Sequence, residues 1–276
     1  MDTRVAFSAV SSDPPAVRHA RVTVPPENRT MQDDRRLLGL EGASNFRDLG
    51  GYPGRDGRPL RWRRVFRSDH LGHLTAADRG VLESLQLRRA FDFRGGEERT
   101  AQAYALPGVI QYSLAIEPTV AQQVHRLNEA GIALTPERMV GLMEDLYRHL
   151  INDQAARFAE WFAHLLDDDS PLVFHCTAGK DRTGLAAALF LLALGVPLHT
   201  IEQDYLLTND VYRRPSSVGH DIAHETLAVL WSVRSGFLQA ALAAIEDDHG
   251  GIDRYLEQRM KLTTSARERL ARLYLQ

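Results

Sequence analysis

Residues 172–184 read LVFHCTAGKDRTG, and this stretch decides the fold that we predict. A buried β-strand ends at His175, a short loop follows, and an apolar helix begins near Arg182, six positions after Cys176. A loop of this length that enters a helix can aim its backbone N–H groups and the positive end of the helix dipole at one point. The stretch therefore predicts an anion site that suits a phosphate dianion.

The same loop supplies groups suited to phosphoryl transfer. The field that attracts an anion also stabilises a thiolate, so we expect Cys176 to be nucleophilic near neutral pH. Arg182 carries a planar guanidinium that matches two phosphoryl oxygens and stabilises the charge of the transition state. Thr183 can hydrogen-bond the thiolate or assist water in attacking a phosphocysteine. The predicted phosphate-binding residues are those of the loop and the helix start: Thr177, Ala178, Gly179, Lys180 and Thr183.

These residues resemble a known family. The pattern HC-x5-R-T-G over residues 175–184 is similar to the signature of the protein tyrosine phosphatase superfamily. The string Gly179-Lys180-Asp181-Arg182 resembles its atypical bacterial branch, of the mycobacterial tyrosine phosphatase B type. Further segments look like motifs of that branch, and they lie at residues 45–48, 66–68, 92–94, 204–209 and 250–256.

The resemblance runs from about residue 40 to the end of the chain, and it implies both fold and activity. It implies a parallel sheet flanked by helices, no metal and no cofactor, and dephosphorylation of phosphotyrosine. Some members also accept phosphoserine, phosphothreonine and phosphoinositides. The expected partner is therefore a phosphorylated protein or a phosphoinositide.

A proton donor is needed because a tyrosyl or alkyl oxygen leaves poorly as an anion. Relatives of the classical kind carry this acid on a Trp-Pro-Asp loop, and this chain has no such tripeptide. Asp181 is the first candidate, because side chains of the loop splay toward the leaving group. Asp92, at the end of a neighbouring strand, is the second, with a structural ion pair to Arg94 as the competing interpretation.

Lysine is rare in this chain, and that makes Lys180 informative. Only Lys180 and Lys261 are lysines, whereas the chain has 33 Lys and Arg residues in total. We expect Lys180 on the rim of the loop, where its cation could meet a second phosphate of the substrate. Plain surface charge is the alternative.

Strands that alternate with helices indicate an α/β fold with a central, mostly parallel sheet and a helical C-terminal region. Residues 1–38 are rich in Pro, Ser, Arg and Asp and are expected to form a flexible arm before a phosphatase domain over 39–276. Continuous helical character is expected over 136–168 and over about 222–246. The apolar stretch within 210–249 suggests a helical lid.

Composition excludes several classes of protein. The net charge of −3 argues against a nucleic-acid partner, and no apolar run reaches the ~18 residues of an integral membrane segment. A single cysteine rules out an intrachain disulfide and fits a reducing compartment. No signal peptide is evident, which favours the cytoplasm and leaves export without a cleaved signal open. The oligomeric state is not set by the sequence.

Two other functions compete with a tyrosine phosphatase. One is a phosphoinositide or inositol-phosphate phosphatase with incidental tyrosine activity, and Arg61, Arg63 and Arg64 are compatible with an anionic membrane surface. The other is an inactive module that binds phosphorylated ligands. Such modules commonly lose the nucleophile and the arginine that this chain retains. A reactive thiolate without a partner cysteine should also be inactivated by peroxide unless a lid covers it.

Overall fold

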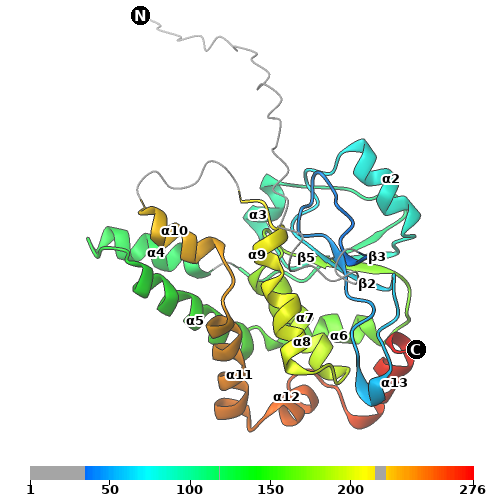
Figure 1. The fold of residues 1–276 in the computed structure, drawn as a ribbon. Helices are drawn as coiled ribbons and strands as arrows, with labels where there is room; N and C mark the ends of the chain where they lie inside the picture. The colour runs from blue at the N-terminus through cyan, green and yellow to red at the C-terminus, as the bar shows by residue number, and fades with distance from the viewer. Residues whose placement is uncertain (1–34, 118, 215–221) are drawn as a thin grey trace, which may run out of the picture.

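The computed structural model describes residues 35–117, 119–214 and 222–276 (Figure 1). Most of the predicted arm over residues 1–38 and a part of the predicted lid, residues 215–221, lie outside the described residues. The described chain folds as an α/β structure, in agreement with the sequence.

The sheet has five strands in the order β1-β2-β5-β3-β4. The strands are β1 (Arg47–Asp48), β2 (Val65–Ser68), β3 (Arg89–Asp92), β4 (Ile110–Ser113) and β5 (Leu172–His175). Only β1 is antiparallel to its neighbour. The central strand β5 is in register with β2 and β3, so that Ser68, His175 and Asp92 end their strands side by side. Ligands of parallel sheets bind at this carboxyl edge, and the predicted loop begins there.

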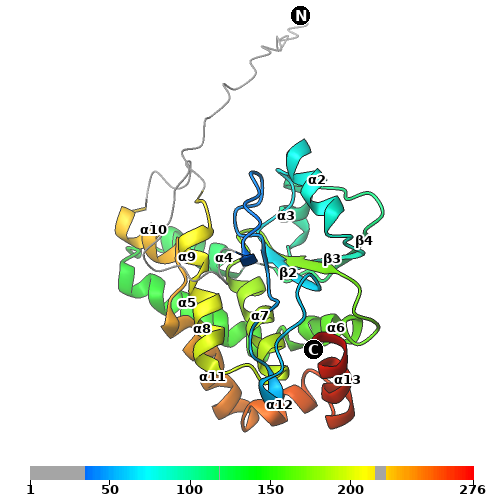
Figure 2. The same ribbon diagram turned by 45° about the vertical axis from the view of Figure 1, so that its right-hand side comes forward.

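The helices are α2 (Ala76–Ser84), α3 (Gly96–Ala101), α4 (Thr119–Glu129), α5 (Pro136–Asn152), α6 (Ala155–Leu165), α7 (Asp181–Ala193), α8 (Leu198–Leu206), α9 (Thr208–Val211), α10 (His224–Trp231), α11 (Ser235–His249), α12 (Ile252–Gln258) and α13 (Thr264–Tyr274), with a 3-10 helix η2 (Arg55–Gly57). Figure 2 shows α13 beside α6, where Tyr274 donates a hydrogen bond to the Leu165 carbonyl at 3.1 Å.

The two faces of the sheet are apolar and belong to two different cores. Val65, Phe91 and Phe174 lie in the larger core, which also takes residues from α5 to α8 and from α11 to α13. Their chain neighbours Phe66 and Val173 lie in the smaller core with side chains of α2. Alternation of this kind follows from the two-residue period of a strand. The sheet is therefore covered on both sides, as a parallel sheet requires.

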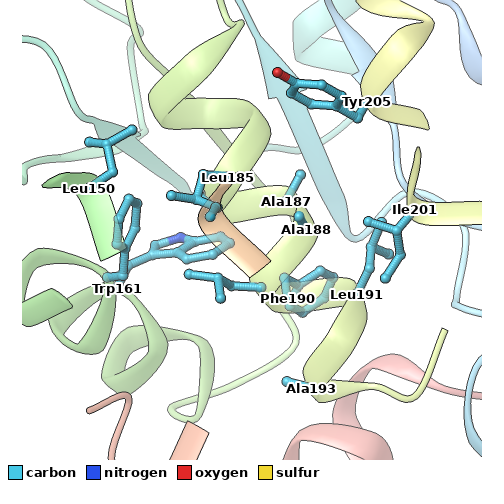
Figure 3. Close-up of a cluster of buried hydrophobic side chains, with 14 of the residues drawn as sticks. Leu150, Trp161, Leu185, Ala187, Ala188, Phe190, Leu191, Ala193, Ile201 and Tyr205 are labelled. Carbon is cyan, nitrogen blue, oxygen red and sulfur yellow. The ribbon is translucent and has the colours of Figure 1, made fainter. Parts of the chain in front are cut away.

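Helix α7, which starts at the predicted loop, is buried on nearly all sides. Figure 3 shows Leu185, Phe190 and Leu191 leaving it in different directions, with Trp161 on one side and Ile201 on another. A helix that is apolar all round has to be surrounded by other elements. This packing fixes the helix that carries Arg182.

Helices α4, α5, α10 and α11 form a group beside the sheet (Figures 1 and 2). The expectation of continuous helix was wrong in two places, because residues 153–154 separate α5 from α6 and residues 232–234 separate α10 from α11. At the second break, Asn209 hydrogen-bonds both the N–H and the C=O of Val233, at 2.8 and 2.9 Å, and so replaces helical partners.

In the part of the chain that is described, no single helix is long and apolar enough to span a membrane. Helices α10 and α11 meet that test only when they are taken together, and they are bent by 52°.

Candidate active site

The loop between β5 and α7 has each backbone carbonyl from residue 176 to residue 180 engaged in a hydrogen bond. The partners are His175 Nδ1 for Cys176 (3.2 Å), His70 N for Thr177 (3.0 Å), Asn45 Nδ2 for Ala178 (2.9 Å) and Gly179 (3.0 Å), Arg67 for Gly179 (2.9 Å), and Gly184 N for Lys180 (2.8 Å). A trans peptide holds its C=O and N–H on opposite sides. The N–H groups are therefore directed to the other side of the loop, where converging amides can hold an anion.

Gly179 is required by this geometry. Its φ is +64°, and a Cβ at this position would lie 2.4 Å from the Ser68 carbonyl oxygen and 2.6 Å from the Asp69 nitrogen. A side chain would therefore be strained and would also collide with backbone that cannot move freely. The loop can approach the end of β2 only with glycine here.

A buried group of four residues, which we call the arginine frame, holds the loop from behind: Asn45, Arg47, Arg67 and Asp204. Arg67 bonds Asp204 at 2.6 Å and Arg47 bonds it at 3.0 Å, while Arg47 also bonds the side chain of Asn45. Burial alone would raise the pKa of Asp204, but its two arginines lower it below the ordinary range. The frame therefore stays charged and anchors the two carbonyls that Asn45 contacts.

Arg182 lies at the start of α7 and is oriented by Glu98 of α3. Its guanidinium donates to both carboxylate oxygens at 2.6 and 2.8 Å, and to the carbonyl of Ile116 at 2.9 Å. Burial opposes the ionised form of Glu98, but the bonds from Arg182 outweigh it and lower the pKa of Glu98 to about 2. Thr177 also donates to this carboxylate. Glu98 was not recognised from the sequence.

Asp181 is the first residue of α7 and lies at the cavity. Tyr147 of α5 donates to its Oδ1 at 3.0 Å, and the hydroxyl groups of Tyr147 and Tyr205 are 2.6 Å apart. Its Oδ2 lies 3.3 Å from the ammonium nitrogen of Lys180. The sequence indicated Asp181 but gave no sign of the two tyrosines.

Lys180 lines the cavity, but its side chain is buried and is not exposed on the rim of the loop, where we expected it. It is only 3% exposed, and its ammonium group donates to the carbonyls of Leu230 at 2.5 Å and Ser232 at 3.2 Å. These carbonyls lie at the C-terminal end of α10, where a cation is favoured by the helix dipole. In this conformation the charge of Lys180 is bound to α10 and is not directed to solvent.

Asp92 is engaged by Arg94. The guanidinium donates to both of its carboxylate oxygens, with a shortest distance of 2.7 Å. Burial opposes ionisation, but Arg94 outweighs it, and the pKa of Asp92 is lowered. Asp92 is also not among the residues that line the cavity. The geometry therefore favours the structural interpretation of Asp92 over a role as an acid.

His175 is buried and neutral behind the loop. Burial is the main reason that its pKa is lowered to about 4. Because the Cys176 carbonyl can only accept, Nδ1 carries the proton, and Nε2 accepts from Tyr104 at 2.6 Å. His175 thus supports the loop and carries no proton to the site.

Cys176 lies at the floor of a cavity of about 360 Å³. The thiol residue is only 2% exposed. The walls of the cavity are mostly apolar and come from α4, α5 and α10 and from the segment before α4: Ile116, Val120, Val124, Met143, Leu146, Leu150, Leu230 and Trp231. The polar groups are concentrated on the loop at its floor, together with Glu117. Such a cavity suits an apolar group that ends in an anion.

The structure thus brings Cys176, Arg182, Asp181 and the loop together, and leaves Asp92 behind them. Thr183 is fully buried, and its hydroxyl has no hydrogen-bond partner within the described part of the chain. Nor do the described residues contain a group of three side chains that could hold a metal ion.

Comparisons with known proteins identify the family of this chain. Residues 38–276 match the tyrosine phosphatase family. A provisionally named tyrosine-protein phosphatase of Cupriavidus necator is 34% identical over 257 residues, which cover 88% of this chain and 91% of that protein. PtpB of Mycobacterium tuberculosis, a triple specificity protein phosphatase, is 28% identical over 256 residues, which cover 79% and 91%.

Solved structures are more distant. P. aeruginosa TpbA matches with a TM-score of 0.30 and 17% identity, over 67% of this chain and 89% of that one. The family is therefore established by the sequence match, which spans the whole sheet and the loop. By this match, the chain belongs to the tyrosine phosphatase family.

Proposed function

We propose that this phosphatase hydrolyses phosphotyrosine through a phosphocysteine on Cys176. One observation carries the proposal: Cys176 lies at the floor of an apolar cavity, in a loop whose carbonyls are all bonded and whose arginine is already oriented by Glu98. Preorganised donors of this kind stabilise charge that develops in a transition state.

In the first step the thiolate of Cys176 attacks phosphorus and the bond to the ester oxygen breaks. Arg182 and the loop amides stabilise the charge on the three remaining oxygens. Asp181 gives its proton to the departing ester oxygen, because this carboxyl group lies at the cavity beside the loop.

In the second step a water molecule attacks phosphorus and gives a proton to the Asp181 carboxylate. The S–P bond breaks, inorganic phosphate leaves, and the thiolate is restored. The sequence predicts a bond from Thr183 to this sulfur, but in the structure the buried Thr183 hydroxyl has no partner among the described residues.

The walls of the cavity favour an aromatic ester. A phenyl ring buries apolar area against Leu146, Leu230 and Trp231. An inositol ring would lose hydration of its hydroxyl groups on the same walls. Lys180, which we expected to bind a second phosphate, is bonded to α10, and this also disfavours a polyphosphorylated ring.

The Cys176→Ser variant tests the mechanism. It should lose turnover of para-nitrophenyl phosphate and still bind vanadate, because the loop and Arg182 remain in place. Turnover by this variant at the rate of the native enzyme would exclude the phosphocysteine. A panel of phosphotyrosine, phosphoserine and phosphothreonine peptides and phosphoinositides then tests the substrate class, and phosphotyrosine should be hydrolysed fastest.

A further inference from the structure

Two buried tyrosines lie behind the acid of the proposed function. Tyr147 is on α5 and Tyr205 is on α8, and both are at most 1% exposed. We propose that Tyr147 is a positioning residue that fixes the carboxyl group of Asp181 for proton transfer, with Tyr205 fixing Tyr147 in turn. This inference rests on the proposed role of Asp181.

The direction of each hydrogen bond follows from chemistry. An ionised carboxylate can only accept, so Tyr147 uses its one hydroxyl proton to bond Asp181 Oδ1 at 3.0 Å. Its oxygen then accepts from Tyr205, whose hydroxyl is 2.6 Å away. The chain of donors therefore runs in one direction, toward Asp181.

Both hydroxyl groups keep their protons at neutral pH. Burial is the main reason that the pKa of Tyr147 and the pKa of Tyr205 are raised well above the ordinary value, and the charge of Asp181 raises them further. Tyr147 thus donates a fixed hydrogen bond and does not itself deliver the proton to the substrate. The transferred proton is the one on the Asp181 carboxyl group.

The bond leaves one carboxylate oxygen for the substrate. Oδ1 is taken by Tyr147, and Oδ2 is the oxygen that can carry the proton to the ester oxygen. Lys180 lies 3.3 Å from Oδ2, but its ammonium group is held by the carbonyls of Leu230 and Ser232. Fixing Oδ1 prevents rotation of the carboxyl group, and orientation of this kind contributes to the rate.

The charged or titratable groups that face Asp181 come from several elements. Lys180, Arg182 and Cys176 come from its own loop and helix, Tyr147 from α5, Tyr205 from α8, Tyr212 from the segment after α9, and Glu117 from the rim of the cavity. From α10 the lining residues are Leu230 and Trp231, which do not titrate. Tyr147 is the only side chain in the described residues for which a hydrogen bond to Asp181 is observed.

The test compares Tyr147→Phe with Tyr255→Phe, which removes the same atom from another buried tyrosine. Tyr255 bonds the Ile151 carbonyl at 2.9 Å, near the C-terminal end of α5, and has no bond to Asp181, so its variant controls for lost stability. For Tyr147→Phe, kcat/KM should fall about tenfold on phenyl phosphate and at most about twofold on para-nitrophenyl phosphate, whose leaving group needs less protonation. Tyr255→Phe should leave both rates unchanged.

The pH profile provides a second readout. Tyr147 donates a hydrogen bond to the carboxylate, and a bond of this kind favours the ionised form of a carboxyl group. The alkaline limb of kcat/KM for phenyl phosphate should therefore move to higher pH in Tyr147→Phe. A profile that coincides with that of Tyr255→Phe, or an equal loss on both substrates, would overturn the inference.

The Asp181→Asn variant distinguishes failure of the positioning role of Tyr147 from failure of the proposed role of Asp181 as the acid. If Asp181→Asn loses phenyl phosphate activity selectively and Tyr147→Phe does not, only the positioning role is wrong. If Asp181→Asn shows no selective loss, both are wrong. Should Tyr147→Phe fold poorly, Tyr205→Phe provides the test, because it keeps the direct bond to Asp181. For the inference to stand, Tyr205→Phe must lose activity selectively on phenyl phosphate, and by less than Asp181→Asn does.

Discussion

The ammonium group of Lys180 donates a hydrogen bond to the Leu230 carbonyl at 2.5 Å and so connects the catalytic loop with α10. A second bond reaches the Ser232 carbonyl, immediately after the helix. Because α10 also supplies Leu230 and Trp231 to the wall of the cavity, Lys180 holds one wall against the floor. The lid that we predict over residues 210–249 would open by breaking this contact.

Lys180→Met should make Cys176 more sensitive to peroxide. Loss of a hydrogen bond from a charged group should raise the population of open forms, and the rate of inactivation should rise about tenfold. The measurement is the loss of activity with time in peroxide, relative to the starting activity of each protein. Lys261→Met, at the other and exposed lysine, is the control. Equal rates for the two variants would show that Lys180 does not close the site.

Glu98→Gln should lower kcat/KM by as much as about 10²-fold, because Arg182 loses the charged partner that orients it. The matched control is Glu97→Gln, on the same helix but exposed. Steady-state kinetics with para-nitrophenyl phosphate measure kcat/KM in both variants, and inhibition by vanadate measures their binding of an anion. If the two glutamine variants behave alike, the orientation of Arg182 does not depend on the carboxylate of Glu98.

Gly179→Ala should abolish vanadate binding and turnover, since its Cβ would collide with Ser68 and Asp69. Gly57→Ala separates this collision from backbone strain. Gly57 has a similar φ, +73°, but no atom within 4 Å of the added Cβ. That variant should lose about 1–2 kcal/mol of stability and keep its activity. Normal vanadate binding by Gly179→Ala would contradict the close approach of the loop to β2.

His175→Gln should flatten the dependence of stability on pH. Burial lowers the pKa of His175 from its ordinary value of 6.5 to about 4. Between these values the unfolded chain binds a proton that the folded chain does not, so the free energy of unfolding falls as the pH falls from 6.5 to 4. Removing His175 removes that contribution.

Thermal unfolding at pH 7 and at pH 4.5 measures the effect, with His224→Gln at an exposed histidine as the control. Burial raises the pKa of Asp69 to about 6, so Asp69 makes the free energy of unfolding rise as the pH falls. Asp69 is present in every variant, and its contribution cancels in the comparison. If both variants lose the same amount of stability between pH 7 and pH 4.5, His175 does not titrate on unfolding in this range.

The local parts of the fold follow from the sequence. Thr75 caps α2: its hydroxyl accepts from the N–H of Asp78, and its own N–H donates to the Asp78 carboxylate. The strand, loop and helix around Cys176 are where the pattern placed them. These features depend on short-range spacing and on capping chemistry, which a single sequence displays.

The parts that the sequence did not reveal depend on contacts between distant residues. Glu98 meets Arg182 from 84 positions away, and Asn45 meets Gly179 from 134. The break after α10 is stabilised by Asn209, which lies 24 positions before Val233 in the sequence. Lys180 was expected on the rim of the loop, yet the carbonyls that bind it belong to an element about fifty positions away.

The arginine frame has a consequence for the response of the enzyme to ionic strength. Arg47 and Arg67 share the single carboxylate of Asp204, and all three side chains are at most 1% exposed. The surplus positive charge behind the loop is thus out of reach of dissolved ions, which screen exposed charges over about 10 Å at 0.1 M salt. Phosphate bound at this loop should therefore tolerate salt far better than phosphate attracted by surface arginines.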